Sequence, residues 1–156
     1  MRRLLLIAVL FAALPLRSAT AETSCDLQGA WQLVSAKYDN QPAAPTYSAV
    51  KLFTKTRFAF FGYDTALRGP LVSDADRLKF FSNLNAGGGS YMVSAGAWTE
   101  KIDQFSDPAY IGMSITFQCV REGDRLIQKG TLPIFDGGKK VRDISLEEVY
   151  RRVDRP

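Results

Sequence analysis

The chain has 156 residues, of which 46% are hydrophobic and 23% charged, the composition of one ordinary globular domain. It contains 20 Lys and Arg, 16 Asp and Glu and no histidine, which excludes Ser-His-Asp and Cys-His catalysis and histidine-ligated zinc or haem. Two cysteines are too few for a thiolate metal site, so we expect no metal and no cofactor. The classes of protein that remain are a binding protein, a surface module and an enzyme that uses carboxylates and tyrosines.

The first residues have the three parts of a secretory signal peptide. Two arginines open the chain, residues 4–16 are almost wholly apolar, and residues 19–21 (Ala-Thr-Ala) form the small-x-small pattern that a signal peptidase accepts. The apolar run is too short for a permanent membrane span, although an N-terminal anchor helix is the alternative. We therefore expect residues 1–21 to be removed and residues 22–156 to form one domain that is periplasmic or secreted.

Cleavage also changes the charge of the protein. The remaining 135 residues have 17 basic and 16 acidic side chains, a net charge of +1. After cleavage the sequence has no stripe of basic residues, so neither nucleic acid nor an anionic membrane is an expected partner. No later apolar run is long enough for an integral membrane segment.

The remainder of the chain alternates apolar and polar residues in short segments separated by turn residues, which is typical of β-strands. One stretch, residues 73–84, favours a short helix, because Ser73 is a capping residue and Leu78 and Phe81 fall on one face. The eight predicted strands cover residues 30–38, 49–53, 57–63, 90–94, 97–105, 111–121, 125–132 and 141–153.

Short and long connections alternate between these strands. Tight turns follow the second, fourth and sixth strands, whereas segments rich in Gly, Pro, Asp and Asn follow the others, including residues 133–140. In an up-and-down meander, this places the tight turns at one end and the long loops at the other. Eight such strands avoid exposed edges by closing into a barrel, whose interior holds side chains or one small ligand. We predict an all-β fold, an eight-stranded antiparallel up-and-down barrel with one short helix or lid segment; an open sandwich is the alternative.

Several motifs resemble those of the calycin superfamily. Residues 27–35 (LQGAWQLVS) contain the Gly-x-Trp opening of lipocalins. The similarity continues at residues 51–55 (KLFTK), 87–91 (GGGSY), 98–100 (WTE), 106–110 (SDPAY) and 145–152 (SLEEVYRR). This ordered series resembles a group of bacterial exported lipocalin-like domains. The resemblance implies a lipocalin-like barrel and leaves the activity open.

Two structural pairs are expected at the tight-turn end. In calycins an arginine late in the chain packs across the Gly-x-Trp indole. The alternation of the last strand makes Arg152 the arginine that matches Trp31. Such a cation–π contact stabilises a fold by about 0.5–2 kcal/mol. Cys25 precedes the first strand and Cys119 lies near the end of the sixth, so both fall at this end. In an oxidising compartment they are expected to form a disulfide, which would stabilise the folded state by about 4 kcal/mol in the chain-entropy model. Two unpaired thiols are the alternative.

Alternation also predicts which side chains face the interior. Bulky side chains fill the tight-turn end: Trp31, Phe58, Val93, Trp98, Phe117, Leu126 and Tyr150. The middle and upper parts mix apolar and polar groups, as small-ligand sites do. The predicted ligand-binding residues are Leu33, Ser35, Phe60, Tyr91, Glu100, Ile102, Met113, Ile115, Gln128, Leu146 and Glu148.

Glu100 and Glu148 are the sharpest functional candidates, because a buried carboxylate must be paired or neutralised. Each could act as an acid or accept a hydrogen bond from the hydroxyl or amine of a ligand. Alternatively, a strand bulge places Glu148 outside, or each carboxylate forms a structural ion pair with Lys37, Arg142 or Arg152.

The first functional hypothesis is a barrel that binds a small, partly hydrophobic molecule entering from the long-loop rim, with Phe80 and Phe81 on a segment that acts as a lid or a plug. The second is an isomerase or decarboxylase that works without histidine, as some calycin relatives do, with Tyr91, Glu100 and Tyr150. No motif positions a reacting group, so we assign no catalytic residue and do not favour an enzyme.

The third hypothesis is a protein-interaction or envelope-structural module with a filled barrel. A contiguous apolar patch on the outer strand faces would support it. Val34, Tyr38, Phe53 and Phe61 are its candidate members.

Overall fold

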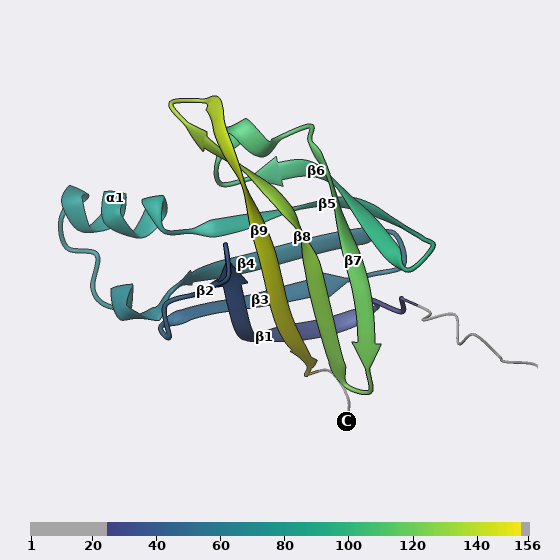
Figure 1. Ribbon diagram of the computed structural model, residues 1–156. Helices are drawn as coiled ribbons and strands as arrows, with labels where there is room; N and C mark the ends of the chain where they lie inside the picture. Colours follow the sequence, from purple (N-terminus) through teal and green to yellow (C-terminus); the bar gives the residue numbers. More distant parts are fainter. Residues whose placement is uncertain (1–24, 154–156) are drawn as a thin grey trace, which may run out of the picture.

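The computed structural model describes residues 25–153, so the predicted signal peptide lies outside the described residues. These residues form a closed antiparallel barrel of eight long strands (Figure 1), which confirms the predicted fold class. Closure comes from β1, which pairs with β3 along one edge and with β9 along the other. The strands are β1 (Gly29–Tyr38), β2 (Gln41–Pro42), β3 (Tyr47–Phe53), β4 (Arg57–Asp64), β5 (Asn85–Ser94), β6 (Ala97–Phe105), β7 (Ser114–Glu122), β8 (Arg125–Asp136) and β9 (Lys139–Arg152). The short strand β2 only extends the far end of β1.

The tight turns lie where they were predicted, but one long loop does not exist. Residues Pro133 to Asp136 continue β8, and Gly137 and Gly138 form the turn to β9 with φ angles of 54° and 76°. Both angles are in the left-handed region, which glycine adopts without strain. Because β7 stops pairing with β8 at Gly130, this part of β8 is a free edge, where a proline interrupts no ladder on that side.

The three glycines at 87–89 belong to β5, although we expected that strand to begin at residue 90. A Cβ atom at Gly89 would collide with the Lys101 carbonyl group of β6, and one at Gly88 would lie 2.6 Å from the Phe58 carbonyl oxygen of β4. A bulge between Gly88 and Gly89 presses the strand against both neighbours. The glycines are therefore required for close packing and do not end the preceding loop.

The tight-turn end is closed by a core around Trp31, which is fully buried. The Trp31 indole Nε1 donates to the Leu27 carbonyl oxygen at 2.7 Å. The Arg152 guanidinium carbon lies 4.6 Å from the ring centre, as the resemblance implied, and that of Arg121 lies 4.5 Å from it, which sequence reasoning missed. Two cationic groups over one buried ring stabilise this end electrostatically as well as by burial.

Cys25 and Cys119 form the predicted disulfide, which ties the segment before β1 to β7. The other bulky residues predicted for this end are buried, with one exception. Val93 is 45% exposed, because β5 pairs with β4 only as far as Ser90, so the last residues of β5 have a neighbouring strand on the β6 side alone. The disulfide and the Trp31 core together make this end the rigid base of the barrel.

A bulge in β1 between Leu33 and Ser35 corrects the predicted inward face of that strand. Beyond the bulge the alternation is reversed, so Ser35 is exposed, whereas Ala36 is buried and Tyr38 lines the interior. The placement of Ser35 in the ligand site was therefore wrong, as was the outward placement of Tyr38. A bulge changes the parity of a strand without a sequence signal that we recognised.

The predicted helix is α1 (Asp74–Ser82), capped by Ser73 through reciprocal hydrogen bonds with Asp76. No residue of α1 is buried, and the helix projects away from the barrel (Figure 1). None of its residues lines the interior cavity, so α1 is neither the lid nor the plug that we considered. Among residues 25–153, no helix is both long enough and apolar enough to cross a membrane.

The interior is covered instead by the end of the β8–β9 hairpin. Leu132, Ile134 and Ile144 of this hairpin face the cavity. A short 3₁₀-helix, η2 (Pro108–Tyr110), fastens the hairpin, because the Tyr110 hydroxyl donates to the Pro133 carbonyl oxygen at 2.6 Å. A second 3₁₀-helix, η1 (Thr65–Leu67), follows β4.

Replacing both cysteines by serine should lower the free energy of unfolding by about 4 kcal/mol, because the disulfide closes a loop whose ends are 94 residues apart. Urea denaturation followed by tryptophan fluorescence measures this loss. The parent protein unfolded in the presence of a reductant is the matched control and should lose a similar amount. Unchanged stability in both experiments would contradict a structural role for the bond.

Candidate binding cavity

A cavity of about 310 Å³ lies between the Trp31 core and the β8–β9 hairpin, at the lower end of the range of about 300–1,000 Å³ for small-molecule sites. Most of its wall is apolar or aromatic. Seven of the predicted ligand-binding residues line it: Phe60, Glu100, Ile102, Ile115, Gln128, Leu146 and Glu148.

The other predicted residues lie elsewhere. Leu33 packs against the hydrophobic core, and the Tyr91 hydroxyl donates to the Thr54 carbonyl oxygen at 2.7 Å near the tight-turn end. Met113 precedes β7 instead of belonging to it, and it lines an outer groove between β7 and β8. Tyr91 stands opposite Glu100 in the β5–β6 ladder, but it does not line the cavity that Glu100 and Tyr150 share. The cavity therefore lacks one of the three side chains suggested for an enzyme.

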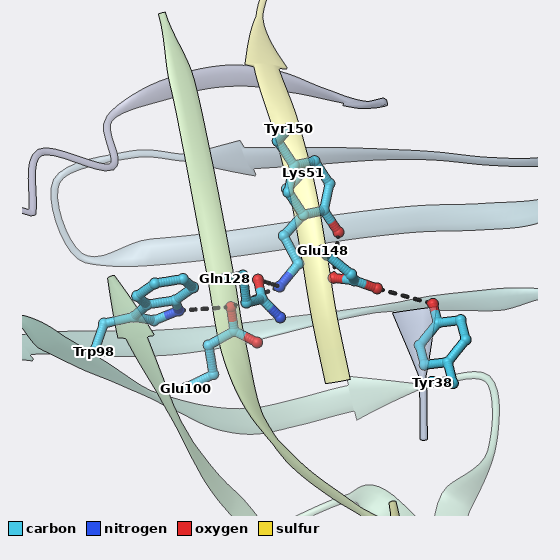
Figure 2. Close-up of polar contacts among 7 residues, drawn as sticks. All are labelled: Tyr38, Lys51, Trp98, Glu100, Gln128, Glu148 and Tyr150. Carbon is cyan, nitrogen blue, oxygen red and sulfur yellow. Dashed lines mark hydrogen bonds and ion pairs between the residues drawn. The ribbon is translucent and has the colours of Figure 1, made fainter. Parts of the chain in front are cut away.

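The first polar group of the cavity is built around Lys51, which sequence reasoning missed (Figure 2). Its ammonium nitrogen donates to Glu100 Oε1 at 3.1 Å and to Gln128 Oε1 at 2.8 Å. Trp98 Nε1 donates to the same Glu100 oxygen at 3.0 Å. The Lys51 ammonium group also lies 5.1 Å from the centre of the Phe117 ring, close enough for a cation–π contact.

This group is almost completely buried: Lys51 is 5% exposed and Glu100 is 4% exposed. Of the alternatives considered for Glu100, the ion pair is the correct one, but its partner is Lys51 and none of the three basic residues proposed. Arg142 instead pairs with Asp39 at 2.6 Å, outside the barrel. Strand parity contains the missed signal, because Ala49, Lys51 and Phe53 all face inward. The expected outward position of Phe53 hid this signal, because residues two apart lie on the same face of a strand.

The second polar group of the cavity is built around Glu148 of β9, which is 6% exposed. The Tyr38 hydroxyl donates to Glu148 Oε1 at 2.9 Å, and the Tyr150 hydroxyl donates to Glu148 Oε2 at 2.7 Å. Glu148 therefore faces the interior, and the alternative that a bulge places it outside is wrong. Within residues 25–153, no Lys or Arg forms an ion pair with it, so its hydrogen-bond partners are neutral phenols.

Burial and the nearby negative charge affect the tyrosines of this group. Burial, followed by the charge of Glu148, raises the pKa of Tyr38 and of Tyr150 well above the ordinary value. The same two causes raise the pKa of Tyr47 to about 12. These phenols therefore remain protonated at any physiological pH and keep their hydroxyl protons for donation.

The charges that line the cavity do not balance. Lys51, Glu100 and Glu148 are its three charged side chains, so the lining has one more negative than positive group. Two further polar atoms are available there: in the part of the chain that the structure describes, no group donates to Glu100 Oε2 and no group accepts from Gln128 Nε2. The cavity therefore combines apolar walls with a few convergent polar groups.

No cluster of three or more His, Cys, Asp or Glu among residues 25–153 is arranged to hold a metal ion. A scan against protein-family models and a search of curated proteins each find no match to this chain. The barrel is compatible with a lipocalin-like, calycin fold.

Replacing Lys51 by methionine should lower the free energy of unfolding by about 3–5 kcal/mol, because it leaves the buried Glu100 carboxylate without a counter-charge. Adding Glu100→Gln should restore most of this loss, since the remaining pair is neutral. Chemical denaturation of the single and double variants measures both effects.

The exposed pair Lys129–Glu147 supplies the control, because its atoms are 2.9 Å apart but both side chains reach solvent. Lys129→Met should cost no more than about 1 kcal/mol. A loss for Lys51→Met as small as that for Lys129→Met would contradict the importance of the buried pair.

The barrel should lose stability as the pH rises above 10. An unfolded Tyr47 phenol ionises near pH 10, whereas the folded one resists ionisation until about pH 12, so the folded state binds more protons in this window. The contribution is fully present below pH 10 and falls by roughly 2–3 kcal/mol by pH 12. Tyr47→Phe should therefore show a shallower decline in chemical denaturation between pH 10 and 12. Equal slopes in both proteins would contradict the assignment.

Proposed function

We propose that this protein binds one small, partly hydrophobic molecule inside the barrel. The observation that supports the proposal is the interior cavity of about 310 Å³, in which apolar walls surround two buried polar groups. A barrel whose only task was structural would gain stability by filling this space, since empty volume sacrifices packing contacts. Burying Lys51, Glu100 and Glu148 is a further cost that packing alone does not require.

We further propose that the protein is an exported member of the bacterial lipocalin-like domains. The Gly-x-Trp motif supports this assignment, because Trp31 occupies the closed end of the barrel beneath an arginine that comes late in the chain. The disulfide between Cys25 and Cys119 fits a periplasmic or extracellular compartment, where thiols are oxidised. The signal-like N-terminus agrees with this location.

The polar groups suggest how a ligand is oriented. Among the described residues, Glu100 Oε2 is free to accept and Gln128 Nε2 is free to donate a hydrogen bond to a ligand at one side of the cavity, and the Tyr38–Glu148 pair forms the other side. The aromatic rings of Phe60 (β4), Phe105 (β6) and Tyr110 (η2) form a continuous series in the cavity wall, with neighbouring centroids 4.7–5.2 Å apart. A ligand with an apolar body and at least one polar end matches this arrangement.

A surface for protein interaction is the second candidate, and one observation favours it. Leu52 and Phe61 are 49% and 46% exposed on the outer face of β3 and β4, and Val50 pairs with Phe61 across these strands. Val34 of β1 is also exposed, whereas Phe53, once expected on this face, is buried. The outer apolar residues therefore differ from those expected, since Leu52 is exposed where Phe53 was predicted.

Native mass spectrometry of the protein purified from its own host tests ligand binding. We expect a bound small molecule that is released on unfolding. Leu132→Trp should remove it, because the larger side chain would fill the cavity beneath the hairpin. Thr131→Trp, one residue earlier on the exposed face of β8, should retain it and is the matched control. Only the mass of the bare chain in the parent protein would contradict ligand storage and leave the interaction surface as the better explanation.

A further inference from the structure

We infer that the ligand is a small organic cation, an ammonium group on an apolar body, with the ammonium held by Glu148. This inference rests on the proposed binding function and specifies the ligand class. It comes from a comparison of the two polar groups inside the barrel, which have similar components but different charge balance.

The Lys51 group shows what this interior provides for an ammonium ion. One carboxylate oxygen and one amide oxygen accept from Lys51, and the rings of Phe60, Phe117 and Tyr150 lie 5.1–5.9 Å from its nitrogen. Such aromatic faces stabilise a desolvated cation through their quadrupoles. The protein supplies this ammonium from its own chain.

The Glu148 group has the same components without a cation. A buried carboxylate is again surrounded by aromatic residues, since Tyr38, Tyr47 and Tyr150 all line the cavity beside it. Tyr38 and Tyr150 each donate one hydrogen bond, but a phenol contributes no charge. Figure 2 shows Glu148 reaching into the interior from β9, between Tyr38 and the Lys51 group.

Charge then determines the class of ligand. Lys51 and Glu100 neutralise each other, so the uncompensated charge of the lining is that of Glu148. In a weakly polar interior this charge attracts a cation and repels an anion more strongly than it would in water. Each carboxylate oxygen of Glu148 retains a second lone-pair direction after accepting from one tyrosine. An ammonium group that donates there would complete the site.

The neutral parts of the cavity determine the size and polarity of the part of the ligand that carries the ammonium group. The wall opposite Glu148 includes Phe60, Ile102 and Phe105, which offer no hydrogen bonds from their side chains. The volume of about 310 Å³ is at the small end of the range for ligand sites and suits one aromatic or aliphatic group. Primary amines with one such group therefore fit better than fatty acids or sugars.

Isothermal titration calorimetry at neutral pH with the disulfide-bonded full chain tests this inference. The probes are 2-phenylethylamine, cyclohexylmethylamine and hexylamine, each compared with the alcohol of the same skeleton, and with phenylacetate as the anion. We expect at least one amine to bind ten times more tightly than its alcohol, and phenylacetate not to bind. An alcohol that binds as tightly as its amine, or a failure of all three amines, would overturn the inference.

Variants then assign the charge to Glu148. Glu148→Gln keeps the size of the side chain and should reduce amine affinity at least tenfold, to that of the alcohol. Glu147→Gln is the matched control, because Glu147 pairs with Lys129 on the outside of β9 and should leave affinity unchanged. The ligand comparison uses the unmodified chain, so it remains decisive if Glu148→Gln does not fold. If an alcohol bound as tightly as its amine, the cation inference would be wrong, but the proposed ligand-binding function would stand. That function is tested separately by the co-purification experiment.

Discussion

The pairing of β1 with β9 is the constraint on which the rest of the structure depends. It joins residues near the two ends of the described chain, from Trp31 opposite Arg152 to Tyr38 opposite Leu146. Without this ladder, β1 and β9 would be exposed edges of an open sheet, and the inner face of that sheet would not be enclosed. The Trp31 core and the disulfide reinforce the same closure at one end, where the Arg152 guanidinium lies over the indole ring.

Closure also explains the cost and the use of the buried polar residues. Lys51 comes from β3, Glu100 from β6, Gln128 from β8 and Glu148 from β9, so no two of the four share a strand (Figure 2). Each is tolerated inside only because another strand supplies its partner. Lys51 satisfies Glu100, whereas Glu148 is satisfied by neutral hydroxyl groups. This difference makes the cavity electrostatically asymmetric.

The two ends of the barrel have different tasks. The tight-turn end is densely packed with aromatic side chains and tied by a covalent bond, which suits a rigid base. At the other end the β8–β9 hairpin lies over the cavity and is fastened by Tyr110, which also stacks on Phe105. The only α-helix in the described part of the chain has no part in this cover.

The sequence by itself determined the strands, the closed barrel and the disulfide, because these follow from alternation, turn residues and chain direction. The Trp31–Arg152 contact was expected from the resemblance to calycins, and alternation only selected Arg152 over its neighbour. Strand parity also predicted seven of the cavity residues, including Glu100 and Glu148. Only the tertiary structure decided the bulge in β1, which exposes Ser35 and turns Tyr38 inward, and the burial of Lys51. A bulge depends on how two distant strands register, and a lysine is tolerated in a core only when carboxylate and amide groups from other strands meet it. Neither condition is local, so no pattern along a single strand could reveal them.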